Sequence, residues 1–158
     1  MLTHYGALDY DFSTLVEKVK TIKDWVYRSD VESYTTCKLC PNDQEFPKEE
    51  VNTLLNEVTK YLPAGYQNRV VLSCVPAGED ILPHTDDFGE EVRSQSIHCH
   101  IPLITHKDVV MGFDSGEYHL REGELYSMDE TKRHWVSNRS SVNRVHLLFA
   151  HFPHIIGD

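Results

Sequence analysis

Four polar residues in the second half of the chain have the types and order that could hold a redox-active metal beside a dicarboxylate. His84 and Asp86 place an imidazole and a carboxylate two residues apart, and Arg144 follows the more distant His134 by ten residues. Residues two apart on an extended strand point to the same side, so His84 and Asp86 could grip one ion together. Two imidazoles and one carboxylate form the facial triad of non-haem Fe(II) oxygenases, which leaves coordination positions open.

His106 and Asp108 form a second pair with the same spacing, as chance allows in a chain with ten histidines and 25 acidic residues. Context separates the two pairs. His84 and Asp86 follow an apolar run at 70–75 and a Pro-Ala-Gly turn, which indicates a strand re-entering a sheet. His106 and Asp108 lie between two apolar runs, which is typical of a hairpin turn. We therefore expect the metal at the first pair.

Alternation along two predicted strands separates a chemical face from a core face. His98 and His100 share one face of the strand at 96–104, and Arg144 shares a face with His146 on the last strand. An arginine among apolar residues is costly to bury alone. It could pair with a protein carboxylate, or it could clamp a ligand carboxylate through its two-point guanidinium, which we favour.

His134 has a simpler interpretation as a hydrogen-bonded structural residue. Its place in a polar turn just before a strand, with an arginine ten residues on, favours a metal ligand instead.

Hydrophobic periodicity predicts two amphipathic helices, at 12–28 and 48–61, followed by short strands. The strands are expected at 69–75, 96–104, 109–113, 117–120, 124–128, 134–138 and 143–151, and residues 1–10 could form a further extended segment. This order predicts an α+β fold: a double-stranded β-helix, or cupin-like jelly roll, with about two N-terminal helices packed on its sheet. We expect a single domain over 1–158, with helical support and a candidate lid in 1–65, including the irregular loop 29–47, and the jelly-roll core in 66–158.

Composition narrows the class of protein. A net charge of −10 argues against a nucleic-acid surface and favours a small or peptidic partner. No apolar run reaches the roughly 20 residues of a membrane span and no signal sequence is visible, so we expect a cytoplasmic protein away from membranes. Cys37 and Cys40 have zinc or redox spacing without a second ligand pair, whereas Cys74 and Cys99 are interpreted as small core residues. Nothing indicates an oligomeric state.

The segments between Asn68 and Phe152, taken in order, resemble the aspartyl/asparaginyl β-hydroxylase family of 2-oxoglutarate-dependent Fe(II) oxygenases, which also includes free-proline hydroxylases. The resemblance is carried by Pro-His-x-Asp at 83–86, His-Ile-Pro-Leu-Ile-Thr at 100–105, Gly-Glu at 123–124, His-x-Val-x-Asn at 134–138 and Arg-Val-His-Leu at 144–147. It implies Fe(II) bound by His84, Asp86 and His134, with Arg144 pairing with the distal carboxylate of 2-oxoglutarate. In the first 65 residues we recognise no motif.

The same resemblance implies hydroxylation of an unactivated C–H bond of an amino-acid side chain with O2, giving succinate and CO2. The substrate stays open between peptidyl Asp or Asn and a free amino acid such as proline. His98 stands where many members have an arginine, so the contact to the second cosubstrate carboxylate or to the substrate is also open. Ser73 falls where some relatives have a cosubstrate-binding hydroxyl. Candidate apolar walls are Trp135, Val136, Leu148 and Phe149.

Two other interpretations fit the same residues. A cupin-type metalloenzyme would use His98, His100 and His134, and would make Asp86 dispensable. A metal-free jelly-roll protein with a binding or structural role would have no affinity for iron.

Overall fold

The computed structural model describes residues 2–27, 39–41, 44–86 and 95–154. Within them lie two helices, α1 (Ser13–Lys20) and α2 (Lys48–Val58). The strands are β1 (Leu2–Ala7), β2 (Trp25–Tyr27), β3 (Leu39–Pro41), β4 (Gly65–Val75), β5 (Asp80–His84), β6 (Ile97–Ile104), β7 (Val109–Phe113), β8 (Gly116–Tyr118), β9 (Glu124–Met128), β10 (His134–Asn138) and β11 (Arg144–Pro153).

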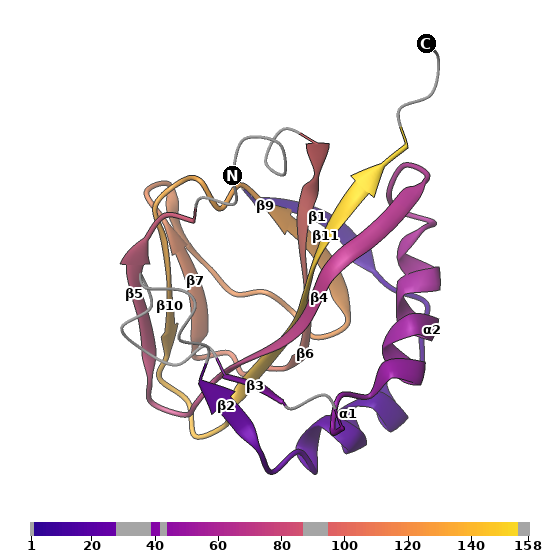
Figure 1. The fold of residues 1–158 in the computed structure, drawn as a ribbon. Helices are drawn as coiled ribbons and strands as arrows, with labels where there is room; N and C mark the ends of the chain where they lie inside the picture. The colour runs from indigo at the N-terminus through magenta and orange to yellow at the C-terminus, as the bar shows by residue number, and fades with distance from the viewer. Residues whose placement is uncertain (1, 28–38, 42–43, 87–94, 155–158) are drawn as a thin grey trace.

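The strands form two facing antiparallel sheets (Figure 1). The larger has seven strands in the order β1-β9-β6-β11-β4-β3-β2, and the smaller has four in the order β5-β10-β7-β8. Both helices lie on the side of the larger sheet that faces away from the smaller one (Figure 1). The predicted α+β jelly roll with two N-terminal helices is confirmed.

Strand β11 shows how the alternation of the sequence separates two interiors. Val145, Leu147 and Phe149 pack toward the helices, in one core with Leu15 of α1 and Leu54 of α2. Residues between them point into the space between the sheets. There Val75, Met111, Phe113, Tyr126 and Val136, among others, form a second and smaller core. One face of the strand is thus free to carry polar chemistry, because the other supplies the burial that stabilises the fold.

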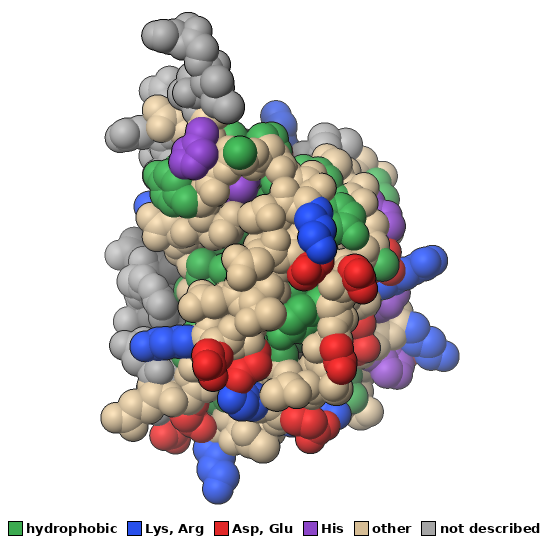
Figure 2. Space-filling view, turned by 90° about the vertical axis from the view of Figure 1, so that its right-hand side faces the viewer, with side chains coloured by type: hydrophobic (Ala, Val, Ile, Leu, Met, Phe, Trp, Pro, Cys, Tyr) green, Lys and Arg blue, Asp and Glu red, His purple; other side chains and the backbone are tan. Residues whose placement is uncertain are grey.

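The helices place an apolar stripe against the sheet and charged residues outside. In α2 the buried residues are Val51, Leu54, Leu55 and Val58. Figure 2 shows the face that is on the right in Figure 1, where Lys and Arg side chains lie scattered among Asp and Glu. None of the helices in the described residues is long and apolar enough to cross a bilayer.

The first helix is shorter than predicted. It ends at Lys20 rather than near Arg28, and Trp25–Tyr27 forms strand β2. The Thr21 hydroxyl donates to the carbonyl of Lys18, and the Glu45 carboxylate accepts the backbone N–H groups of Lys23 and Asp24. Thr21 thus satisfies a carbonyl group at the helix end, and Glu45 satisfies two N–H donors that a longer helix would have used internally. Val26, expected on the apolar stripe, is 52% exposed.

Other expected elements differ mainly at their ends. The second helix stops at Val58 rather than residue 61, β4 begins at Gly65, and β5 is a strand that the sequence pattern does not predict. Cys74 and Cys99 are buried as expected, and burial raises the pKa of the Cys99 thiol to about 12. Cys37 and most of the 29–47 loop lie outside the described residues.

Candidate active site

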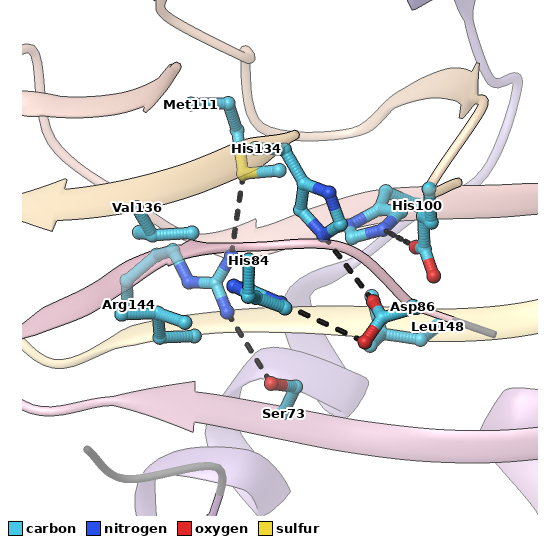
Figure 3. A pocket seen from close by; sticks show the side chains of 11 residues that line it. Ser73, His84, Asp86, His100, Met111, His134, Val136, Arg144 and Leu148 are labelled. Atoms are coloured by element: carbon cyan, nitrogen blue, oxygen red, sulfur yellow. Dashed lines mark hydrogen bonds and ion pairs between the residues drawn. The ribbon is translucent and has the colours of Figure 1, made fainter. Parts of the chain in front are cut away.

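A pocket opens between the two sheets, and residues from both line it (Figure 3). The four-stranded sheet contributes Ile81, His84, Met111, His134 and Val136. The seven-stranded sheet contributes Ser73, His100, Arg144 and Leu148, and the connections contribute Asp86 and Glu130. Titratable groups distant in the sequence therefore converge on one space, which is the usual setting of a ligand site.

The strand pairing of the smaller sheet brings together the two histidines of the expected triad. His84 ends β5, His134 begins β10, and the two residues face each other across the antiparallel pair. Their ring centroids lie 4.3 Å apart. Asp86 follows β5 by two residues, and both rings point toward its carboxylate (Figure 3), with Nε2 of His134 at 3.2 Å and Nε2 of His84 at 3.7 Å.

The backbone fixes which nitrogen of each ring faces the carboxylate. Nδ1 of His84 lies 2.7 Å from the carbonyl oxygen of Leu82, and Nδ1 of His134 lies 2.8 Å from that of Lys132. A carbonyl oxygen only accepts, so each Nδ1 carries a proton and donates it. In the neutral ring the lone pair is then on Nε2, which points inward. Such partners are what orient metal-binding histidines.

The carboxylate of Asp86 is held in place and kept ionised. Its backbone N–H donates to the carbonyl oxygen of Glu130 at 2.8 Å. Burial would raise the pKa of Asp86, but the two imidazoles that face the carboxylate, His134 first and then His84, outweigh burial and hold the pKa well below its ordinary range. Burial likewise opposes charge on His134, yet Asp86 raises the pKa of that imidazole.

These three residues fit a divalent metal. One donor atom from each of His84, Asp86 and His134 lies within 4.8 Å of the others, and all three side chains are about 6% exposed. Two imidazoles and one carboxylate suit a first-row transition metal with sites left for other ligands. No other group of three or more potential ligands with this geometry is found in the described part of the chain.

Arg144 lies on the larger sheet at the pocket wall and is only 2% exposed. One terminal nitrogen donates to Ser73 Oγ at 3.3 Å, and the other lies 4.0 Å from the sulfur of Met111 (Figure 3). The second nitrogen also lies 3.1 Å from Nδ1 of His146. These contacts fix the plane of the guanidinium. A planar, oriented fork beside the metal group suits two-point binding of a carboxylate.

Sequence reasoning missed Glu130, which lies in the turn between β9 and β10. Its Oε1 atom is 2.9 Å from Nε2 of His100, and its Oε2 atom is 3.8 Å from Nδ1 of His98. On the other side of the His100 ring, Nδ1 lies 3.2 Å from Nδ1 of His146. The turn composition gave no signal for this residue, because only the folded chain brings the turn to the end of β6.

Polar contacts hold the His100 ring on both sides. Arginine only donates, so Nδ1 of His146 accepts from Arg144, and the same atom faces Nδ1 of His100. Nε2 of His100 donates to the Glu130 carboxylate. His100 is therefore anchored to Glu130 through Nε2. Burial and the nearby Arg144 charge lower the pKa of His146 well below its ordinary value, which keeps that ring neutral.

The remaining predicted residues take varied places. Ser73 lines the pocket, whereas His98 does not and instead has Nε2 3.1 Å from Ser96 Oγ. His106 and Asp108 lie in the connection between β6 and β7, where both side chains are exposed. Of the candidate apolar walls, Val136 and Leu148 line the pocket, Phe149 packs in the core under the helices, and Trp135 packs against Gly112.

Comparison with solved structures gives the same architecture at low sequence identity. A prolyl hydroxylase from Trichoplax adhaerens, in complex with a hypoxia inducible factor peptide fragment, has a TM-score of 0.59 and 8% identity, covering 96% of this chain and 83% of that one. A nickel complex of a non-haem monooxygenase has a TM-score of 0.58 and 13% identity, covering 96% and 73%. A prolyl-4-hydroxylase from Pseudomonas putida has a TM-score of 0.53 and 13% identity, covering 97% and 95%.

These likenesses establish the fold. A comparison with curated proteins found no match. The model of one protein family, aspartyl/asparaginyl beta-hydroxylase, matches residues 4–153, nearly the whole chain and well beyond the segments that carried the resemblance. With an oxygenase-type fold and a His-Asp-His group of metal-binding geometry in its pocket, the chain belongs to the aspartyl/asparaginyl β-hydroxylase family of oxidoreductases.

Proposed function

We propose that this protein is an Fe(II)- and 2-oxoglutarate-dependent dioxygenase that hydroxylates an unactivated C–H bond of an amino-acid side chain. One observation carries the proposal: a buried His-Asp-His group and a buried, oriented arginine line the same pocket from opposite sheets. The metal group alone is compatible with many chemistries. The arginine adds a place for an acid cosubstrate beside it.

His84, Asp86 and His134 would hold the iron through Nε2, a carboxylate oxygen and Nε2. When bound, Fe(II) would supply the activation of O2 and the oxidation of the C–H bond, which protein side chains cannot perform. The protein orients the two imidazoles through the carbonyl groups of Leu82 and Lys132, and it excludes bulk water by burial of the three side chains.

Arg144 would bind the distal carboxylate of 2-oxoglutarate, with the Ser73 hydroxyl beside it. Val136 and Leu148 supply apolar contacts for the carbon chain between the two acid groups. His100, rather than His98, lines the pocket and holds the Glu130 carboxylate. We therefore propose His100 for the contact to the carboxylate at the metal end, where relatives have an arginine.

A cupin-type site built on His98, His100 and His134 is disfavoured by the hydrogen bonds. Nε2 of His100 donates to Glu130 and Nδ1 faces Nδ1 of His146, so both ring nitrogens are directed at protein groups and not at a shared metal position. His98 lies outside the lining of the pocket. Asp86 has no role in that alternative, yet it faces both His84 and His134.

The direct test is succinate formation by the purified protein with Fe(II), 2-oxoglutarate and ascorbate under air, with Asp86→Ala as the inactive control. Some hydroxylases turn over 2-oxoglutarate only when their substrate is bound. Binding of 2-oxoglutarate is therefore titrated in parallel under anaerobic conditions with Mn(II). Metal-dependent binding in the wild type that is lost in Asp86→Ala supports the proposal. If the protein shows no succinate formation and no metal-dependent binding of 2-oxoglutarate, the proposal is refuted.

A further inference from the structure

Asn138 is the last residue of β10, and its side chain is fully buried without lining the pocket. Its amide nitrogen donates to three backbone carbonyl oxygens, at 3.0 Å to Val75, 3.2 Å to Pro76 and 2.9 Å to Val142. Its Oδ1 atom accepts the backbone N–H of Ser140 at 3.0 Å and the Ser140 hydroxyl at 2.7 Å. Because carbonyl oxygens only accept, these contacts allow one orientation of the amide.

Two chain connections cross between the sheets beside Asn138. Residues 76–79 lead from β4 in the larger sheet to β5 in the smaller, and residues 139–143 lead from β10 in the smaller sheet to β11 in the larger. The amide of Asn138 contacts both connections, and its backbone N–H donates to the carbonyl of Glu79 at 3.0 Å. Asn138 is therefore a buried link between the two sheets.

The link lies between the proposed metal group and the proposed cosubstrate arginine. His134 begins β10, the strand that Asn138 ends, whereas Arg144 begins β11. Val142 precedes Arg144 by two residues, and Val75 is paired with Arg144 across β4 and β11. The amide thus holds the chain that leads into Arg144 and the residue opposite it, and joins both to the strand of a metal ligand.

The distance between the two ends of the site decides which acid can be held at both. A 2-oxo diacid bound through its oxo-acid end at the metal and through its distal carboxylate at Arg144 needs a carbon chain of matching length. If the sheets are held at a fixed separation, an acid with one more methylene group must bind in a compressed or misaligned form, which weakens its binding. Loosening the link lets the sheets adjust and lowers this discrimination.

We propose that Asn138 is a positioning residue that fixes the span between Arg144 and the metal group, and thereby sets the chain length of the 2-oxo diacid that the site accepts. The inference rests on the proposed function, because metal and cosubstrate must occupy the pocket for the span to matter. It gives a role to the asparagine of the His-x-Val-x-Asn segment, whose side chain lies outside the pocket.

The test compares 2-oxoglutarate with 2-oxoadipate, which has one more methylene group, by anaerobic titration of the protein loaded with Mn(II). This readout needs no turnover. The wild type should bind 2-oxoglutarate about tenfold or more tightly than 2-oxoadipate. Asn138→Ala should reduce that ratio by about fivefold, because three backbone carbonyl groups lose their shared donor and the sheets can shift. Its affinity for Mn(II) should change by less than about threefold, because His84 and His134 pair within the smaller sheet.

Two further variants separate position from stability. Val58→Ala, in the core under α2, destabilises the fold without touching the link and should keep the wild-type ratio. Ser140→Ala removes the hydroxyl that donates to Oδ1 of Asn138 and should reduce the ratio by about twofold. It carries the test if Asn138→Ala does not fold.

The inference is overturned by an unchanged ratio in folded Asn138→Ala, or in Ser140→Ala if Asn138→Ala does not fold. An equal fall of the ratio in Val58→Ala would overturn it as well, since lost stability would then account for the effect, and so would loss of Mn(II) binding in folded Asn138→Ala. A wild type that binds both acids equally would remove the role of Asn138 and leave the dioxygenase standing. Failure of 2-oxoglutarate to bind would remove both.

Discussion

Two pairs of histidines lie between the sheets, and one member of each pair stands beside a carboxylate that lines the pocket. His84 and His134 face Asp86, with ring centroids 4.3 Å apart. His100 and His146 have ring centroids 5.5 Å apart, and Nε2 of His100 donates to the Glu130 carboxylate. The residue types are the same in both. Only the first pair has the geometry of a metal site.

The difference lies in where the ring protons go. In the first pair each Nδ1 donates to a backbone carbonyl two residues earlier, which leaves Nε2 for a metal. In the second pair the two rings contact each other through Nδ1, and Nε2 of His100 donates to the Glu130 carboxylate. A cluster of histidines and acids is therefore not sufficient evidence for a metal. The acceptors that the backbone offers decide which cluster can bind one.

We expect the largest effect on metal affinity from a substitution of Asp86, the carboxylate beside the first pair. Asp86→Ala should weaken Mn(II) or Fe(II) binding by more than about 100-fold and abolish succinate formation, since loss of an outer partner of a ligand alone costs about 10- to 100-fold. Equilibrium dialysis with metal analysis measures the affinity. Retained metal binding in Asp86→Ala, together with its loss in His100→Leu, would reverse our assignment of the two pairs.

A substitution of Arg144 should change the affinity for 2-oxoglutarate without changing the affinity for the metal. Arg144→Lys should keep metal affinity but weaken 2-oxoglutarate binding by about ten- to 100-fold, because one ammonium cannot reproduce the two-point contact of the guanidinium. Anaerobic titration of the Mn(II)-loaded protein checks this, with Arg139→Lys on the surface as control. Unchanged affinity for 2-oxoglutarate would remove Arg144 from the site.

The second pair should affect stability rather than metal binding. His100→Leu keeps the approximate volume of the side chain but removes the hydrogen bond to Glu130, and should lower the free energy of unfolding by about 1–3 kcal/mol. Metal affinity should change by less than about threefold if the ring is not a ligand. Urea unfolding and metal titration of the same variant test both parts. Loss of metal with unchanged stability would contradict the comparison.

The smallest effect is expected at the second His-x-Asp pair. Asp108→Ala should leave metal affinity, cosubstrate affinity and succinate formation unchanged and alter the free energy of unfolding by less than about 0.5 kcal/mol, as for most exposed residues. The same assays apply. Loss of metal binding and succinate formation in Asp108→Ala would indicate a metal at His106 and Asp108, and would contradict our assignment to His84 and Asp86.

Several features of the fold were readable in advance, and the exceptions have local causes. The strands β7, β9 and β10 have the predicted bounds, because each combines regular alternation with clear turn residues. The excess length of the first predicted helix came from an apolar period that continued past Lys20. The carboxylate of Glu45, distant in sequence, stops the helix there, and no local pattern could have revealed it.

For the candidate site, the sequence by itself supplied His84, Asp86, His134 and Arg144, since spacing and alternation encode which side of a strand a residue takes. Tertiary structure alone decided the rest. It joined His84 to His134 across two strands about 50 residues apart, set Glu130 against His100, and put His98 outside the pocket. The physical reason is that hydrogen-bond partners and charge states depend on contacts between distant segments, which spacing along one chain does not specify.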